Sequence, residues 1–119
     1  MAVAVAKSNE PIWWSLFSAG GMATALFLPV LIVITGVLLP LGEADEALAY
    51  ERIRPIVAHP IVKLLLFATI SLTFFHWAHR FRFTLVDIGL RKVSTVISIC
   101  CYGGAIVGTF LAVLVLWKL

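Results

Sequence analysis

Charged residues are scarce in this chain, and the few that are present are unevenly distributed. Of its 119 residues, 13% are charged and 62% are hydrophobic, whereas about 25% of the residues in a typical soluble domain are charged. No Asp, Glu, Lys, Arg or His occurs between Glu10 and Glu43, or between Lys92 and Lys118. A soluble chain of this length cannot hide so much apolar surface in its core. The composition therefore excludes an ordinary soluble domain.

The sequence also lacks the common motifs of soluble enzymes and of nucleotide- or metal-binding proteins. It contains no glycine-rich phosphate-binding loop, no dinucleotide fingerprint, no plausible Ser-His-Asp set and no metal-ligand spacing. Its net charge of +3 comes from residues beside apolar runs, where basic side chains are common in membrane proteins. We therefore expect no nucleic-acid partner, no catalytic residue and no metal site in this chain by itself.

Cysteine is rare as well. The two cysteines, Cys100 and Cys101, are adjacent within an apolar run. Neighbouring residues of a helix point about 100° apart, so the two thiols cannot hold one ion, and a disulfide between them would be strained. We predict that both are buried as small apolar side chains.

Long apolar runs are the main feature that is present. A helix needs about 20 apolar residues to cross the hydrocarbon core of a bilayer. The runs predict an all-α membrane protein with three transmembrane helices, at about 13–40, 58–79 and 93–117. The middle run carries Lys63 close to its start, where the side chain can extend to the interface. Because no repeat or soluble segment interrupts the pattern, residues 1–119 are predicted to form one domain.

The N-terminal residues MAVAVAKSNEP favour a helix start over a cleavable signal. Their apolar residues precede Lys7, which is the reverse of the order in a signal peptide. In SNEP, Ser8 or Asn9 can cap a helix, and Pro11 is tolerated in the first turn. We expect the first membrane helix to begin here.

The two loops differ in charge, and this difference predicts the orientation of the chain. The loop at about 41–57 is net acidic, whereas the loop at about 80–92 is net basic. Because Lys and Arg in short loops favour the cytoplasmic side, we place the N-terminus and the basic loop inside, and the acidic loop and C-terminus outside. Trp13 and Trp14 then lie on the same side as His79 and Arg80, near the cytoplasmic interface.

Small residues mark two faces suited to close helix packing. Gly104 and Gly108 are four residues apart in the third run, a spacing that lets helix backbones approach closely. The sequence SAGGMA, residues 18–23, provides a similar patch in the first run. Packing within this chain and docking against the helices of another chain both remain open.

Polar side chains are concentrated at the end of the second run, in TFFHWAHRFRF (residues 73–83). His76 and Arg80 are four residues apart and share a helix face, and His79 is rotated from His76 by about 60°. One interpretation is an interfacial belt of aromatic rings and extended arginines. The other is a pocket for an amphipathic ligand such as a quinone, whose oxygens accept hydrogen bonds from imidazole, guanidinium or indole groups.

Two parts of the sequence resemble a known family. EPIWWSLFSAGGM (10–22), followed by LPVLIVITGVLLPLG (28–42), is similar to the first helix of the D subunits of fumarate reductases. AHRFRF (78–83) falls where that family ends its second helix with a His-Arg pair. Chain length, three spans and orientation also agree, so the resemblance covers nearly the whole chain.

The resemblance implies a membrane-anchor subunit of quinol:fumarate reductase that is not catalytic by itself. The implied complex is a heterotetramer of a flavoprotein, an iron-sulfur subunit and two membrane anchors in the bacterial cytoplasmic (inner) membrane. It would serve anaerobic respiration, with electrons passing from menaquinol through the iron-sulfur clusters to the flavin, where fumarate becomes succinate. Menaquinone would bind at the subunit interface, and the flavin and clusters would belong to the partners.

The resemblance also implies quinone-binding residues. The family's tryptophan matches Trp14, and its His-Arg pair matches His79 and Arg80. Arg80 and His79 would polarise a quinone oxygen, and Trp14 would bound the ring. The carboxylate that accepts quinol protons would come from the other anchor, since the predicted spans contain no acidic residue. Further candidates for the pocket are Trp13, His76 and Arg82.

Other functions are kept as alternatives. His76 raises the possibility of an anchor for a succinate:quinone oxidoreductase with haem b, which transmembrane histidines hold in such proteins; the resemblance is to the haem-free group, so no haem is expected. A small transporter subunit would carry an ionisable group mid-membrane, which the first and third runs lack. A purely structural anchor is the last alternative.

The sequence departs from the family pattern after the His-Arg pair. Arg82 and Phe83 stand where the family has a histidine-rich segment, so a quinone pocket here would rely more on arginine charge and less on titratable imidazole.

Overall fold

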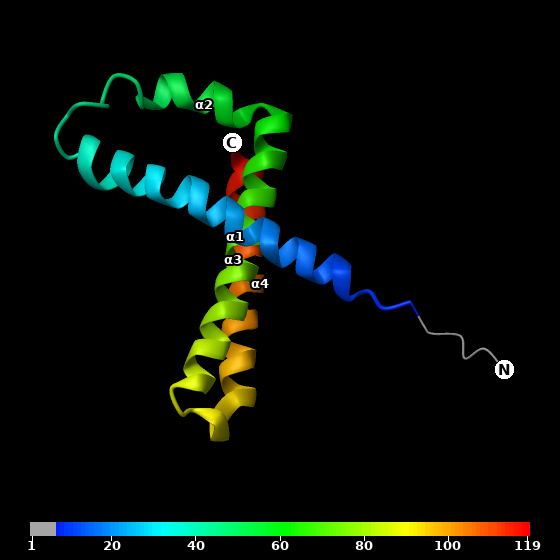
Figure 1. Cartoon of the computed structure of the whole chain (residues 1–119). Helices are drawn as coiled ribbons and strands as arrows, with labels where there is room; N and C mark the ends of the chain where they lie inside the picture. Colours follow the sequence, from blue (N-terminus) through cyan, green and yellow to red (C-terminus); the bar gives the residue numbers. More distant parts are fainter. Residues whose placement is uncertain (1–6) are drawn as a thin grey trace.

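The computed structural model describes residues 7–119, and within this range its regular elements are all helical (Figure 1). The interpretation of the N-terminus as uncleaved depends partly on residues 1–6, which lie outside this range. Three stretches of the described residues are long and apolar enough to cross a membrane, which confirms the predicted all-α membrane fold. In chain order the elements are α1 (Glu10–Val33), the π-helical η1 (Ile34–Leu38), α2 (Tyr50–Ala58), α3 (Pro60–Asp87), the 3-10 turn η2 (Arg91–Val93) and α4 (Ser94–Lys118).

α1 begins within SNEP. The backbone N–H of Glu10 donates to the Ser8 hydroxyl oxygen at 3.1 Å, while Asn9 occupies the capping position without a side-chain hydrogen bond. Pro11 lies in the first turn, where helix amides have no intrahelical partner and its missing N–H leaves no bond unmade. The helix continues through Pro29 into η1, so the first apolar stretch forms one long helical segment.

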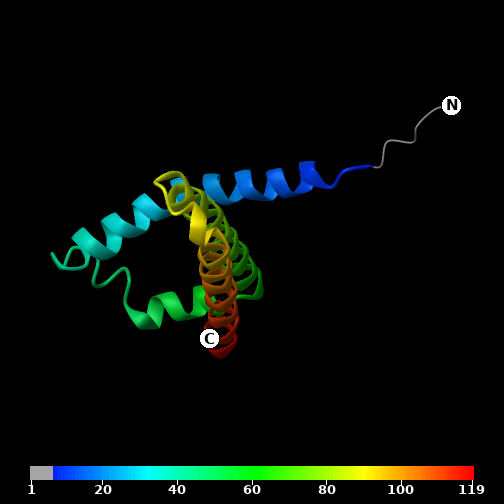
Figure 2. The same cartoon turned by 90° about the horizontal axis from the view of Figure 1, so that it is seen from below.

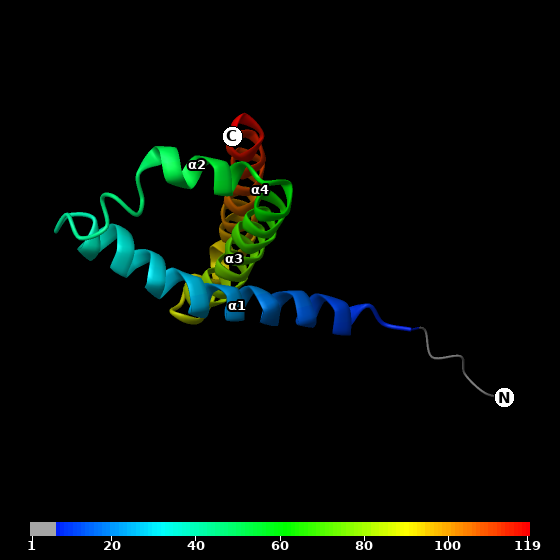
Figure 3. The ribbon, with the colours of Figure 1, turned by 90° about the horizontal axis from the view of Figure 1, so that it is seen from above.

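α3 and α4 form an antiparallel hairpin, and α1 lies steeply across it (Figures 1 and 3). The view from below shows the same crossing (Figure 2). The hairpin turns at Gly89, whose φ of +116° is rarely adopted by residues with a side chain. Mostly small side chains at the centre of the hairpin let the two backbones approach closely. The buried cluster is Ala78, Ile97, Cys101 and Ala105.

The second membrane helix is longer than the predicted range of 58–79. α3 continues to Asp87, so Arg80 and Arg82 belong to the helix and not to the expected basic loop at about 80–92. Arginine is a good helix former, and Leu85 packs against the core of the hairpin, so charge alone does not end the helix. The expected acidic loop at about 41–57 likewise contains nearly all of α2, which spans Tyr50–Ala58.

The two cysteines differ in burial. Cys101 lies in the hairpin core with 4% of its surface exposed, as predicted, but Cys100 is exposed. The prediction for Cys100 is therefore wrong, because residues about 100° apart on one helix cannot both face α3.

α1 meets α3 at a point where only glycine fits. A Cβ atom on Gly20 would lie 2.5 Å from the carbonyl oxygen of Leu72, and one on Gly21 would lie 2.8 Å from Cε1 of the His76 ring. Beside them, Thr24 donates its hydroxyl to the carbonyl of Gly20 at 2.8 Å and lies 3.4 Å from the Thr73 hydroxyl. The backbones of α1 and α3 are therefore nearly in contact at Gly20.

Gly104 and Gly108 of α4 differ in how closely the rest of the chain packs against them. A Cβ atom on Gly108 would lie 2.8 Å from the ring of Phe74 on α3, whereas one on Gly104 would meet nothing within 4 Å. Gly108 thus serves packing within the chain, as does Gly20, and Gly104 leaves its face of α4 free among the described residues.

We predict that Gly20→Ala destabilises the chain and that Gly104→Ala does not. The added methyl group at position 20 forces α1 away from α3, at a cost of about 1–3 kcal/mol. At position 104 alanine gains up to about 1 kcal/mol in helix propensity. SDS titration in detergent micelles, followed by tryptophan fluorescence, measures both. Equal stability of the two variants would contradict the close crossing.

Candidate functional site

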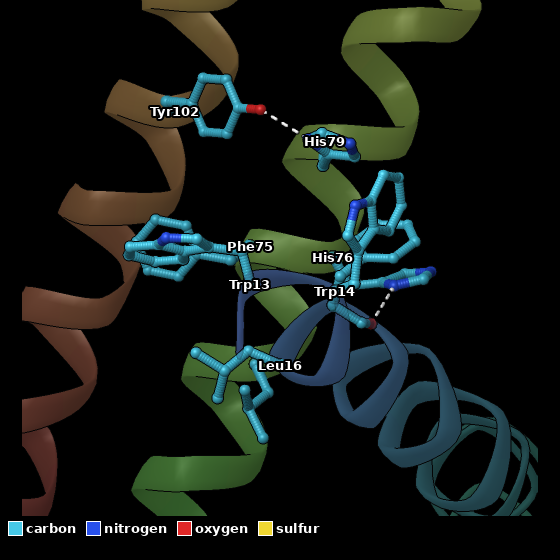
Figure 4. Close-up of a pocket in the computed structure, with 9 residues that line it drawn as sticks. Trp13, Trp14, Leu16, Phe75, His76, His79 and Tyr102 are labelled. Atoms are coloured by element: carbon cyan, nitrogen blue, oxygen red, sulfur yellow. Dashed lines mark hydrogen bonds between the residues drawn. The ribbon is translucent and has the colours of Figure 1, made fainter. Parts of the chain in front are cut away.

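A cleft of about 370 Å³ lies where α1 crosses α3 and faces α4 (Figure 4). Its walls are predominantly aromatic and aliphatic, and their polar groups are two imidazole rings, two indole N–H groups and one phenol. The lining residues are Trp13, Trp14, Leu16, Phe17, Leu72, Phe75, His76, His79 and Tyr102.

His76 of α3 contacts α1 through a hydrogen bond and a ring stack, both with Phe17. Its Nδ1 lies 3.0 Å from the carbonyl oxygen of Phe17. Because a carbonyl oxygen only accepts, Nδ1 carries the hydrogen and donates it. The imidazole also stacks on the Phe17 ring, with centroids 4.4 Å apart and planes 23° apart. In the neutral ring this leaves Nε2 without a hydrogen, as an acceptor.

His79 stands where all three long helices meet. Its Nδ1 lies 2.7 Å from the hydroxyl of Tyr102 on α4. Phe17 of α1 and Phe83 of α3 each approach the imidazole edge-to-face, at 4.9 Å between centroids. Trp14 lies 6.4 Å away in a T-shaped arrangement. The ring is half-buried and held by neighbours on several sides.

Four of the six residues proposed from the sequence line the cleft. Two of them, Trp14 and His79, are brought together from α1 and α3, and the further candidates Trp13 and His76 lie beside them. His76 and His79 are three residues apart and share the face that lines the cleft.

The two arginines do not line it. Arg80 is exposed, because it follows His79 by one residue and is rotated about 100° from it. Arg82 is half-buried, with its guanidinium carbon 4.8 Å from the centroid of the Phe83 ring and 5.9 Å from that of Tyr102.

Phe17 and Tyr102 were not anticipated from the sequence. Phe17 follows Trp14 by three residues, so the helical period alone places it on the same face. Tyr102 offers a weaker signal: it is the one phenol in a run without formal charge, and a buried phenol usually finds a hydrogen-bond partner. Nothing in the sequence identifies His79 as that partner.

The cleft suits a flat, mostly apolar ligand that carries oxygen atoms. Aromatic walls pack against a ring, and the imidazoles offer both a donor and an acceptor. No carboxylate is among the lining residues, and the described residues contain no group of three or more His, Cys, Asp or Glu side chains placed to hold a metal ion. The chain's own groups can therefore bind and polarise such a ligand by hydrogen bonding.

Comparisons with known proteins point to one family. The family model for the D subunit of fumarate reductase matches residues 4–117. The fumarate reductase D subunit of Mycobacterium tuberculosis is 46% identical over 105 residues, which cover 87% of this chain and 82% of the relative. That of Vibrio cholerae is 37% identical over 116 residues, 95% of this chain and 87% of the relative. That of Photobacterium profundum is 37% identical over 109 residues, 91% of this chain and 90% of the relative.

Because Trp14 lies beside His79, the residue that precedes Arg80 in α3, we predict that positions 14 and 80 face the same side of the membrane. The test uses Trp14→Cys and Arg80→Cys, each combined with Cys100→Ser and Cys101→Ala, in sealed inside-out vesicles. An impermeant maleimide should label both single cysteines and should spare Leu41→Cys in the acidic loop. Labelling of positions 14 and 80 from opposite sides would remove the shared site.

Proposed function

This chain belongs to the family of fumarate reductase D subunits, and we propose that it helps form a menaquinone site while it anchors the catalytic subunits of the complex. The anchored partners are a flavoprotein and an iron-sulfur subunit, joined by a second membrane anchor in the bacterial cytoplasmic membrane. Menaquinol gives up two electrons and two protons, and fumarate takes up two of each to become succinate. This chain supplies part of the quinol site and no catalytic residue for fumarate.

The convergence of Trp14 and His79 in one cleft is the observation that carries the proposal. The cleft volume of about 370 Å³ falls in the range of about 300–1,000 Å³ for small-molecule sites. Its aromatic walls match a naphthoquinone ring, and the isoprenoid tail leaves along the apolar surface toward lipid. Trp14 bounds the ring, and His79 hydrogen-bonds a ring oxygen, which stabilises the negative charge that develops there during electron transfer.

Arg80 lies outside the cleft of the single chain, and its proposed role is to stabilise negative charge on the quinone oxygen through the electric field of its guanidinium. It lies on the turn of α3 next to His79 and is exposed. The partner subunits cover this surface in the proposed complex, which excludes water and strengthens the field of the guanidinium at the quinone oxygen. Because no carboxylate lines the cleft, the carboxylate proposed to accept the quinol protons belongs to a partner.

We predict that Arg80→Leu lowers quinol-dependent fumarate reduction in the assembled complex at least about tenfold, which corresponds to the loss of about 1.4 kcal/mol of electrostatic stabilisation of the transition state. Fumarate reduction with reduced benzyl viologen, which bypasses the quinone, should stay unchanged. Arg91→Leu is the matched control, since Arg91 is an exposed arginine at the same end of the hairpin. Unchanged quinol oxidation in Arg80→Leu would leave this arginine only a scaffold role.

We predict that affinity purification of this chain in mild detergent retains a covalently flavinylated protein, an iron-sulfur protein and a second hydrophobic subunit. The reduced-minus-oxidised spectrum of that complex should lack a b-type haem band, as the resemblance to the haem-free group implies. A b-type band would favour the haem-containing succinate:quinone oxidoreductase. A chain that purifies alone and transports solute in liposomes would favour the transporter.

A further inference from the structure

The hydrogen bond between His79 and Tyr102 lies directly beside the buried core of the α3–α4 hairpin. It joins α3 to α4 over 2.7 Å (Figure 4). The residue before each partner is part of the hairpin core: Ala78 has 0% of its surface exposed and Cys101 4%. Core packing on both helices therefore fixes the distance between the imidazole and the phenol, and this contact does not depend on a mobile surface side chain.

The chemistry of the pair decides which group donates. A phenol O–H is a stronger acid than the N–H of a neutral imidazole, so the Tyr102 hydroxyl donates and Nδ1 of His79 accepts. The guanidinium of Arg82, 5.9 Å from the centroid of the Tyr102 ring, favours this direction, since a nearby positive charge stabilises the electron density that gathers on a donating phenol oxygen. Occupation of Nδ1 as an acceptor places the ring hydrogen of neutral His79 on Nε2.

His76 has the opposite arrangement. Its Nδ1 must donate, because its partner is the carbonyl oxygen of Phe17, so its Nε2 keeps the lone pair. The two histidines of one cleft are thus held in different tautomers by neighbours on two different helices. His79 is left with a donor for a ligand, and His76 with an acceptor.

We propose that Tyr102 is a positioning residue that selects the His79 tautomer able to donate from Nε2 to an oxygen of the bound quinone. This inference rests on the proposed quinone site. It adds a reason for ligand specificity: with its hydrogen on Nε2, His79 favours a ligand that places a hydrogen-bond-accepting oxygen beside it. Without the phenol, His79 is free to place its hydrogen on either nitrogen and to rotate, and the donor is present for only part of the time.

The first test is Tyr102→Phe in the complete complex. The variant keeps the ring and removes only the hydroxyl, so the hairpin core is preserved. We expect kcat/KM for a quinol to fall about five- to tenfold, the usual effect of one hydrogen bond. A higher KM and a lower kcat both contribute, because the bond from His79 positions the quinol and also stabilises the charge that develops on its oxygen. Fumarate reduction by benzyl viologen should be unchanged. Tyr50→Phe, which removes the other phenol of the chain at an exposed site on α2, should match the unaltered complex.

A double-mutant cycle separates positioning from a direct role of Tyr102. His79→Gln retains an amide donor but has no tautomer to select, so adding Tyr102→Phe to it should change kcat/KM by less than about twofold. An equal loss in both backgrounds overturns the proposal, because Tyr102 then acts independently of His79. Wild-type kinetics in Tyr102→Phe with impaired His79→Gln also overturns it, but leaves the quinone site intact. Wild-type kinetics in both single variants removes His79 from the quinone site itself.

Discussion

The close approach of α1 to α3 at Gly20 is the constraint on which the cleft depends. Because Gly20 has no Cβ, its backbone lies against the carbonyl of Leu72. Phe17 is one turn before Gly20 and His76 one turn after Leu72, so the crossing brings these two residues into register. A wider separation would break the 3.0 Å hydrogen bond between His76 and the Phe17 carbonyl and pull Trp14 away from His79. The absence of a side chain at Gly20 therefore determines how closely the aromatic residues of α1 approach the histidines of α3.

The same hydrogen bonds that shape the cleft also join the helices. Within a bilayer little water is available to satisfy an isolated polar group, so a partner within the protein is strongly favoured. His76 finds one on α1 and His79 on α4. Hydrophobic burial contributes little here: the described residues include only six buried hydrophobic ones, while most large apolar side chains face outward. Helix association therefore relies on glycine and alanine contacts and on these few polar pairs.

The apolar helices and the protein family could be predicted from the sequence, because the first depend on the hydrophobicity and charge of individual residues and the second on a recognisable motif. The gaps in charge located the three apolar helices. The family resemblance proposed Trp14 and His79 as quinone-binding residues; the structure brings them together in one cleft, and their role in quinone binding stays a prediction. Charge failed to locate the end of α3, because arginine tolerates a helix and the chain turns only at Gly89. Tyr102 was not found, because its partner lies 23 residues away and the pairing depends on how α3 and α4 face each other.

The sequence by itself determined which segments enter a membrane, since hydrophobicity and charge act residue by residue and need no neighbour. It also determined that the polar groups gather near the end of the second span. Only the tertiary structure decided that Tyr102 enters the cleft and Arg80 does not. The face that one helix shows another depends on rotation and crossing angle, and these follow from close contacts such as Gly20 with Leu72 and Gly108 with Phe74.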